Sequence, residues 1–426
     1  MYNVNMKLAI KVQCVSGLNV LRQLGRITTG LYNVANYERK QIWESTGRLP
    51  TYVDQCRDLK NHKLVKVLHS QVAQQTLNEI DRAYKSYFAL KKNGHTEAEP
   101  PRFRKPKKPK SVWFTPSSFK VLSPTEIRFS ISNLGLTEKY LVVRIIPDDR
   151  HDITELNIKM INVTFDGDKV FASLCLEIEE PQIDKYEDVI AVDLGICNLA
   201  ATIDTKGHES IISGRKLLSI QRYFNKKVAR LQSIKDKQDK KNQKKSTKTI
   251  RRLKRKQSRQ VKHLLHIASK QLVEQAKKQK ACLVVGDLTN IRKSSPSINK
   301  KEVKKKNQKI HSWSFATFTS LLKYKCQISG VQLFQVGERY TSRRCPQCGV
   351  VKRSNRQKRG HYKCSCGYVC NADINGAKNI LFKFLGPENV SPLSVDNGVV
   401  VRGVDLSLFK FDSSKLNRRR IPVALA

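Results

Sequence analysis

Two close pairs of cysteines constrain the fold of this chain more than any other local feature. Two residues separate Cys345 from Cys348, one residue separates Cys364 from Cys366, and fifteen residues separate the pairs. Zinc prefers four thiolates in a tetrahedron, and each close pair can supply two ligands from one turn. The spacing therefore predicts a small zinc module at 341–371.

The second cysteine pair has a shorter spacing than the first. It has the spacing CxC, so its turn must be tighter than that of the first pair. Cys370 follows four residues later and is an alternative to Cys366 as the fourth ligand. Four thiolates leave no open position on the metal, so the zinc is expected to be structural.

The net charge points to the partner. The chain carries 81 Lys and Arg against 36 Asp and Glu, a formal net charge of +45, spread along its whole length. Such a chain repels itself, and a bound polyanion relieves the repulsion. DNA or RNA is therefore the expected partner. A ribosomal or membrane-surface protein with basic tails is the alternative, but its charge would be concentrated in the tails.

The expected compartment of the protein follows from the absence of long apolar runs in the sequence and from its cysteines. No run of 18 or more apolar residues could span a membrane, and the first residues lack the apolar core of a signal peptide. The cysteines number eleven, an odd count, and four of them form metal-type pairs. Both facts favour a reducing compartment, and we expect a cytoplasmic protein.

The first half of the chain predicts helices followed by short strands. Apolar residues at helical spacing predict helices at 18–44 and 62–92, whose arginines are expected to be solvated or to touch phosphate. Prolines exclude a helix from the basic segment 100–110, which is either a charged linker or an extended strap along a phosphate backbone. Six strands with turn residues between them then predict a small antiparallel barrel. These strands are expected at 112–114, 119–122, 127–131, 141–146, 158–165 and 170–178, with an Asp166-Gly167 hairpin between the last two.

From about residue 187 the pattern is mixed α/β. The expected strands are 189–193, 199–203, 210–212, 281–287 and 331–336, and the expected helices are 217–231, 315–328 and 373–384. A basic helical hairpin with a polar tip is expected around 235–265, followed by a basic loop at 293–311. The nearly uniform sign of the hairpin's charges favours contact with phosphate over a merely solvated face.

Two aspartates stand out in a chain poor in acid. Asp193 ends an apolar strand, and Asp373 opens the last helix. Each alone is commonly structural, since an aspartate at a helix N-terminus suits the helix dipole. Together they suggest phosphodiester hydrolysis by two metal ions, which needs several carboxylates converging on one spot. An RNase H-like sheet supplies such carboxylates from its first strand, a central strand and a late helix.

Several motifs in order resemble a known family. The segments VIAVDLGICNLAATID, ACLVVGDLTNIR, HSWSF, YTSRRCPQCG and NADINGAKNI resemble the RuvC-type nuclease segments of the insertion-sequence OrfB/TnpB family, which is similar to type V CRISPR effectors. The likeness covers roughly residues 7–384. It implies a guide RNA, a double-stranded DNA target with a short flanking motif, and Mg²⁺-dependent DNA cutting by a protein of a transposable element.

The resemblance also implies the domain organisation, an α/β nuclease domain combined with all-β and α parts. The expected parts are a first barrel strand (1–17), a helical recognition lobe (18–99), a nucleic-acid-binding β-barrel (100–185), an RNase H-like, RuvC-type domain (186–340 and 372–385), an inserted zinc ribbon (341–371) and a disordered tail (386–426). In this likeness Asp193 and Asp373 match the first and last catalytic aspartates, and Cys345, Cys348, Cys364 and Cys366 match the zinc ligands.

The middle catalytic acid departs from the family pattern. The usual Glu-Asp-Leu is Gly286-Asp287-Leu288 here. One hypothesis is a nuclease-inactive protein that only binds DNA under RNA guidance. In the other, a different acid has taken the role. Asp287 is the weaker candidate, because strand side chains alternate faces and it should point away. Glu338 is the better one, since it follows a strand that can neighbour 281–287.

We therefore predict that Asp193, Glu338 and Asp373 hold Mg²⁺ and carry catalysis. Glu338 could instead be a surface acid paired with Arg339, Arg343 or Arg344. Three other functions compete with a guided nuclease: a strand-transferring transposase active in DNA recombination, a pure binding module and a Holliday-junction resolvase. A transposase would also need to recognise transposon ends. A pure binding module is supported by Gly286, which replaces the usual glutamate. A resolvase would not need the long basic lobes of this chain.

Overall fold

The computed structural model describes residues 5–131, 138–147, 151–179, 181–182, 185–237, 247–288, 313–357, 360–386 and 401–402. The described residues divide into two compact units, one up to Glu179 and one beyond it. The expected hairpin tip after residue 237, the basic loop 293–311 and nearly all of the tail lie outside the described residues.

A four-stranded antiparallel sheet forms the centre of the first unit, in the order β1-β7-β6-β2. β1 (Asn5–Cys14) pairs along its whole length with β7 (Lys169–Glu179). β6 (Ile158–Asp166) lies between β7 and β2 (Val112–Phe114). The β6–β7 turn contains Gly167 at a φ of 63°, a left-handed conformation that suits glycine. The hairpin predicted from Asp-Gly is therefore confirmed.

A second antiparallel sheet has the order β3-β4-β5. Its strands are β3 (Phe119–Ser123), β4 (Glu126–Ser130) and β5 (Tyr140–Arg144), and a short 3₁₀ turn, η1 (Pro116–Ser118), precedes them. The two sheets share one hydrophobic core. All six strands predicted between 112 and 178 are thus present, and both sheets are antiparallel as expected.

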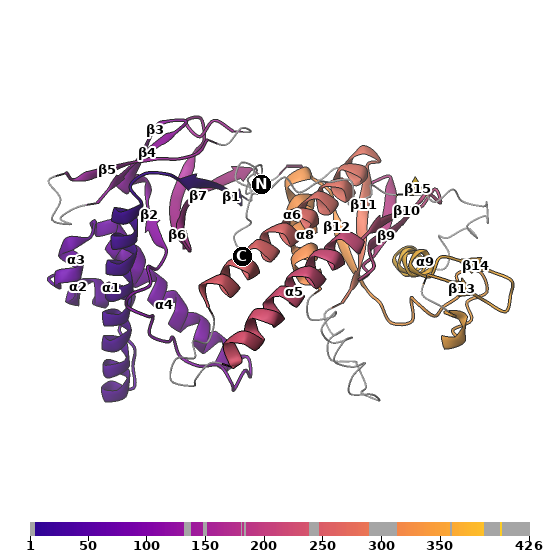
Figure 1. Cartoon of the computed structure of the whole chain (residues 1–426), viewed down its shortest axis with the longest axis horizontal. Helices are drawn as coiled ribbons and strands as arrows, with labels where there is room; N and C mark the ends of the chain where they lie inside the picture. The colour runs from indigo at the N-terminus through magenta and orange to yellow at the C-terminus, as the bar shows by residue number, and fades with distance from the viewer. Residues whose placement is uncertain are drawn as a thin grey trace. The chain divides into compact units, whose positions relative to one another are not determined.

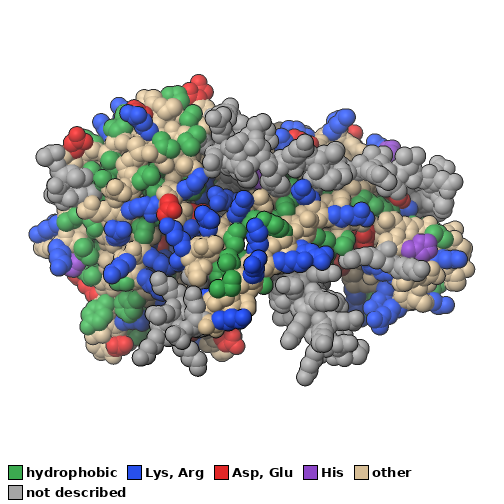
Figure 2. Space-filling model, in the orientation of Figure 1, with side chains coloured by type: hydrophobic (Ala, Val, Ile, Leu, Met, Phe, Trp, Pro, Cys, Tyr) green, Lys and Arg blue, Asp and Glu red, His purple; other side chains and the backbone are tan. Residues whose placement is uncertain are grey.

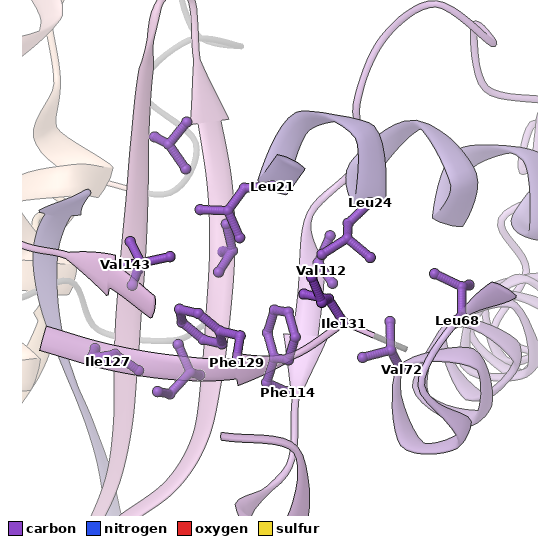
Figure 3. Close-up of a cluster of buried hydrophobic side chains, with 14 of the residues drawn as sticks. Leu21, Leu24, Leu68, Val72, Val112, Phe114, Ile127, Phe129, Ile131 and Val143 are labelled. Atoms are coloured by element: carbon purple, nitrogen blue, oxygen red, sulfur yellow. The ribbon is translucent and has the colours of Figure 1, made fainter. Parts of the chain in front are cut away.

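Helix α1 (Leu18–Thr46) covers this core. It buries Leu21 and Leu24 against β-strand residues that include Phe114 and Phe129, whose ring centroids lie 4.5 Å apart. Figure 3 shows these side chains pointing into one apolar cluster between the helices and the strands. Helix formation at 18–44 was predicted from the apolar spacing and is confirmed.

The expected single helix at 62–92 is wrong, because the chain breaks there. Two helices replace it, α3 (Lys63–Val67) and α4 (Ser70–Lys92), and α2 (Tyr52–Asp58) precedes them. Leu68 is extended, with a φ of −92° and a ψ of 151°. The His69 side chain accepts a hydrogen bond from the Gln71 backbone N–H, which caps the start of α4. The cap and the burial of Leu68 account for the break.

Arg39 corrects the expectation that the arginines of the first helices are solvated. Its side chain is only 1% exposed, and it pairs with Asp81 of α4 at 3.2 Å. Its Nε also donates to Gln55 of α2 at 2.7 Å. A buried charge without partners would be costly. This network therefore ties α1, α2 and α4 together.

The basic segment 100–110 is not helical, as predicted, and it is anchored to α1. Asn36 donates to the Pro101 carbonyl at 3.0 Å, and Asn33 donates to the Arg104 carbonyl at 2.8 Å. At the far end the Lys110 N–H donates to the Gly25 carbonyl. The segment is therefore a strap of fixed position on α1. Contact with phosphate remains a prediction.

The second unit is built on a mixed sheet in the order β12-β11-β8-β9-β10-β15. The strands are β8 (Asp188–Asp193), β9 (Asn198–Asp204), β10 (Glu209–Ser213), β11 (Ala281–Asp287), β12 (Leu333–Gly337) and β15 (Val401–Arg402). β8, β9 and β10 form an antiparallel meander, whereas β11 is parallel to both β8 and β12. The carboxyl ends of β8, β11 and β12 therefore meet at one edge, which positions the site described below.

Helices cover both faces of this sheet (Figure 1). α5 (Arg215–Asp236), α6 (Lys248–Lys278) and α8 (Phe315–Ser329) pack on one face. α9 (Ala372–Leu385) packs on the other. The predicted helical hairpin is confirmed in α5 and α6, although α6 continues well beyond its expected end.

Positive side chains dominate the visible surface of both units. Figure 2 shows Lys and Arg scattered over this face, with few Asp and Glu among them. Within the part of the chain that the structure describes, no helix is both long and apolar enough to cross a membrane.

Candidate metal-dependent active site

Asp193 stands at the carboxyl end of the central strand β8. Strand side chains alternate between the two faces of a sheet. Val189 and Ala191 pack on the α9 side, whereas Ile190 and Val192 pack on the side of α5, α6 and α8. Asp193 continues the first series. Its carboxylate is therefore directed toward α9.

The neighbouring strand carries glycine where the family has glutamate. Gly286 continues the series of Cys282 and Val284, which pack on the α9 side. A Cβ atom built on Gly286 would lie 2.5 Å from Cγ and 2.6 Å from Cδ of Glu338, much closer than atoms can approach. The Glu338 side chain therefore occupies the space that a larger residue at position 286 would need.

Glu338 reaches this space because of strand register. Gly286 pairs with Val336 of β12, and Glu338 follows two residues later on the same side of the sheet. Among the described residues no arginine forms an ion pair with Glu338. The Arg339 guanidinium lies over the Tyr340 ring instead, and that of Arg344 lies over the Phe382 ring. The structure thus does not support the alternative of a surface acid paired with a neighbouring arginine.

Asp287 is placed as strand alternation predicts. It follows Leu283 and Val285, which pack on the opposite side of the sheet from α9. It is exposed, whereas the preceding residues of β11 are buried. Its charge still contributes to raising the pKa of Glu338, so it lies near the site without sharing the face of Asp193.

Asp373 comes from the first turn of α9. Asn371 caps this helix by accepting a hydrogen bond from the Asp373 N–H at 2.9 Å. The Asp373 carboxylate accepts a hydrogen bond from Asn198 at 2.7 Å and forms an ion pair with Arg356 at 3.1 Å. Asn198 opens β9, directly after the turn that follows Asp193. Asp373 is thereby held from both sides.

Gly376 lets the helix approach Asp193 closely. A Cβ atom on Gly376 would lie 2.8 Å from Cγ of Asp193. Gly376 follows Asp373 by three residues, which places both on one face of α9. The sequence analysis did not single out Gly376, Asn198 or Arg356. The spacing from Asp373 could have identified Gly376, but nothing distinguishes Arg356 from the other basic residues of its loop.

The electrostatics show that the acids lie near one another. Burial raises the pKa of Asp193 to about 7, with a further contribution from Asp373, and Arg356 acts in the opposite direction. Burial also raises the pKa of Glu338 to about 8, and Asp193 adds to the shift. Desolvated like charges disfavour ionisation. Asp193 therefore lies within electrostatic range of both Asp373 and Glu338.

These residues suit a hard divalent cation. Carboxylate oxygens are the ligands that Mg²⁺ uses in proteins. The Glu338 Oε1 is buried and has no hydrogen-bond partner among the described residues, which is costly unless a cation or water contacts it. The acids are nevertheless less tightly grouped than the cysteines. Among the described residues only the four cysteines place all ligand atoms within 4.8 Å of one another.

The cysteine cluster forms a second site. The Sγ atoms of Cys345 and Cys366 lie 3.7 Å apart, and those of Cys348 and Cys364 lie 3.5 Å apart. The predicted set of four could therefore hold a zinc ion. A backbone hydrogen bond from Cys366 lowers the pKa of the Cys364 thiol, which favours the thiolate that a metal binds. Around the cluster are β13 (Tyr362–Lys363), β14 (Val369–Cys370) and the 3₁₀ turn η3 (Arg353–Asn355).

Cys370 is not part of this cluster, so the alternative in which it replaces Cys366 is wrong. Its Sγ contacts the Asn371 carbonyl at 3.4 Å. The module is tied to α9 by Asn375 and Asn379, which both donate to the Arg344 carbonyl, at 3.2 and 2.9 Å. The cysteine module and Asp373 are thus held by the same helix.

Two family models match parts of this chain. A family model for OrfB of the IS605 type, described as "Probable transposase", matches residues 173–292. A model described as "Cas12f1-like, TNB domain" matches residues 315–380. Over these ranges the chain is similar to the OrfB/TnpB family.

Two curated relatives match this chain over most of its length. InsQ of Escherichia coli (strain K12), provisionally described as an RNA-guided DNA endonuclease, is 26% identical over 360 residues, covering 81% of this chain and 82% of InsQ. The TnpB-like protein ORF457 of Acidianus two-tailed virus is 26% identical over 394 residues, covering 86% and 83%.

Two solved structures share the fold of this chain. A Cas12f1 in complex with single-guide RNA and target DNA superimposes with a TM-score of 0.60 at 17% identity, covering 84% of this chain and 81% of that one. CasPhi-2 (Cas12j) bound to crRNA superimposes with a TM-score of 0.55 at 10% identity, covering 91% and 99%. The mixed architecture of helices and sheets expected from the sequence is therefore that of Cas12 effectors.

Proposed function

We propose that this protein is an RNA-guided, Mg²⁺-dependent DNA endonuclease of a transposable element, in which Glu338 replaces the family's middle glutamate. One observation carries the proposal: the Glu338 carboxylate fills the space left by Gly286, beside Asp193. The mixed sheet around β8 supports an RNase H-like, RuvC-type nuclease domain, and the cysteine cluster supports an inserted zinc ribbon.

Asp193, Glu338 and Asp373 would hold the catalytic ions. Two bound Mg²⁺ ions would supply the positive charge that activates a water molecule and stabilises the leaving oxygen. The chain's own residues prepare the site. Asn198 orients the Asp373 carboxylate, and Gly376 keeps the helix backbone close to Asp193. The four cysteines would hold Zn²⁺, which fixes the module that carries Arg356.

Arg356 supplies a positive charge beside the acids. It pairs with Asp373 and opposes the rise in the pKa of Asp193. A guanidinium also binds phosphate through a planar pair of donors. When cations neutralise Asp373, Arg356 would be free to contact the phosphate backbone of the strand being cut.

Nucleic acid would be held by the basic face of the α5–α6 hairpin. Six exposed cations on α6 form no ion pair with an acid among the described residues: Arg251, Arg252, Lys254, Lys256, Arg259 and Lys262. Such groups bind phosphates as point charges and release counterions, so affinity should fall steeply with salt. Target sequence would be selected by base pairing with the guide RNA. A reducing, cytoplasmic location is compatible with the free cysteines.

The test is cleavage of a matched plasmid target by the protein purified with the RNA from its own locus. With Mg²⁺ we expect cutting by wild type, at least a hundredfold loss, on the order of what one catalytic group supplies, in Glu338→Gln, and near-wild-type activity in Asp287→Asn. Full activity in Glu338→Gln would exclude its catalytic role.

The nuclease-inactive alternative predicts a different result. It is supported by the missing family glutamate at Gly286, and it predicts guided DNA binding without cutting by wild type. Unchanged DNA affinity after RNase treatment would instead contradict RNA guidance and favour a transposase or a resolvase.

A further inference from the structure

An aromatic cavity lies between α1 and α4, in the first unit and apart from the acidic site. Its volume is about 180 Å³. It is lined by Lys40, Trp43, Glu44, Tyr84, Tyr87, Phe88 and Pro100. Four of these seven residues are aromatic, so most of its wall is ring surface.

The rings are packed against one another yet remain open on one side. The ring centroids of Trp43 and Phe88 lie 5.3 Å apart, and those of Tyr87 and Phe88 lie 4.9 Å apart. Tyr84 is buried and donates a hydrogen bond to Asn36 at 2.9 Å. Trp43, in contrast, is 44% exposed. A tryptophan held in place by its neighbours but not covered offers a free aromatic face.

Charges around the cavity suit a polyanion outside it and a neutral group within it. The strap 100–110 is anchored to α1 and brings Pro100 to the cavity wall. Its Lys105, Lys107 and Lys108 are exposed and form no ion pair among the described residues. Lys40 and Glu44 both lie at the cavity itself, so their opposite charges offset each other there. The lysines of the strap therefore favour a phosphate backbone along α1, and the balanced charges at the cavity favour a neutral group inside it.

We propose that this cavity binds one unpaired nucleobase of a single-stranded nucleic acid. The base stacks on Trp43, a contact that is independent of sequence because every base has an aromatic face. Glu44 accepts a hydrogen bond from an exocyclic amino group, as carboxylates do with cytosine. The lysines of the strap, which lies along α1 toward Gly25, contact phosphates farther along the same strand. The inference extends the proposed nucleic-acid binding but does not depend on DNA cutting.

The experiment measures binding by the full-length protein, freed of copurified nucleic acid, in EDTA and about 150 mM salt. The probes are ten-residue oligocytidylates of RNA and of DNA, and an abasic DNA of the same length that keeps the phosphates. One readout is affinity. The other is the fluorescence of Trp43, obtained as the difference between wild type and Trp43→Phe. We expect both base-bearing probes to quench Trp43 and the abasic probe not to. If the RNA oligocytidylate binds more tightly, the site takes an RNA strand. If the DNA oligocytidylate binds more tightly, the site takes a DNA strand.

Variants separate stacking from a loss of structure. Trp43→Ala should weaken binding of the oligocytidylates about tenfold and leave the abasic probe unchanged, whereas Trp43→Phe should retain most of the affinity. Tyr186→Ala is the matched control, because Tyr186 is 41% exposed, close to the value for Trp43, and its ring packs on Phe334 with centroids 6.0 Å apart. It should change neither affinity.

Three results would overturn the inference: equal quenching by the abasic probe, equal weakening of both kinds of probe in Trp43→Ala, or no weakening at all. Equal binding of all probes to wild type would point to another occupant, such as an apolar protein segment. Because no divalent cation is present, none of these results depends on nuclease activity. Failure of the nuclease proposal would therefore be recognised separately.

Discussion

The carboxyl group of Glu338 lies over the backbone of Gly286, so close that a Cβ atom at position 286 would be 2.6 Å from Glu338 Cδ. Gly286 lies in β11, Glu338 directly follows the neighbouring parallel strand β12, and the two residues are 52 positions apart in the sequence. In the proposed function, Glu338 thus supplies the carboxylate that Gly286 lacks. Each of the two positions accepts a side chain only when the other leaves room.

The two positions should therefore be exchangeable. Glu338→Gly should abolish cleavage, and Gly286→Glu alone should also impair the site because of the clash with Glu338. The double variant Gly286→Glu/Glu338→Gly should recover activity, since it moves one carboxylate back to the position usual in the family. Guided plasmid cleavage measures this. A double variant as inactive as Glu338→Gly, with an unchanged melting temperature, would contradict the shared-space explanation.

Gly376→Ala should reduce cleavage although alanine favours helices. Replacing a helical glycine by alanine commonly stabilises by about 1 kcal/mol. Here the new methyl group would lie 2.8 Å from Cγ of Asp193 and displace the carboxylate. Gly30→Ala in α1 is the matched control, because its Cβ would meet only the end of the Leu64 side chain at 3.1 Å. Equal activity of the two variants would mean that cleavage does not require the close approach of the α9 backbone to Asp193.

Zinc content should separate Cys366 from Cys370. Cys366→Ser removes one of four clustered thiolates and should lower bound zinc well below one equivalent, as measured by atomic absorption. Cys370→Ser should retain the metal, because its Sγ lies outside the cluster. Removing zinc with a chelator should also abolish cleavage, since the module positions Arg356. Retention of zinc by both variants would show that another ligand completes the site.

Lys325 should make stability depend on pH. Burial, reinforced by the nearby Lys270, lowers its pKa to about 8. Between pH 8 and the ordinary lysine value the unfolded chain binds more protons, so stability rises with pH. The cost of keeping Lys325 charged in the folded protein is fully present below pH 8. It disappears as the pH rises to the pKa of lysine in the unfolded chain.

Lys325→Met should therefore raise the melting temperature at pH 7, by about 2 °C, and the gain should shrink toward pH 10. Lys323→Met on the same helix is the control, because Lys323 is exposed. The ammonium of Lys325 also donates to the His266 carbonyl. If that bond outweighed the cost of desolvating the charge, the variant would be less stable at every pH.

Local sequence patterns determined most of the secondary structure. The six strands of the first unit, the helices α1, α8 and α9 and the strand β8 follow from apolar spacing, which acts between near neighbours in the chain. The four cysteines were identified by spacing alone, because each pair forms within one turn. The break at Leu68 was missed, since the capping of α4 by His69 is not visible in apolar periodicity.

Tertiary structure decided which residues meet. The sequence named Asp193, Glu338 and Asp373, partly through strand alternation and partly through family likeness. Only the register of β11 against β12 shows that Glu338 fills the space over Gly286. Likewise, only the fold buries Arg39 on Asp81 and brings Arg356 to Asp373. The physical reason is range: backbone preferences act over a few residues, whereas desolvation and charge act between side chains that folding brings together from distant parts of the chain.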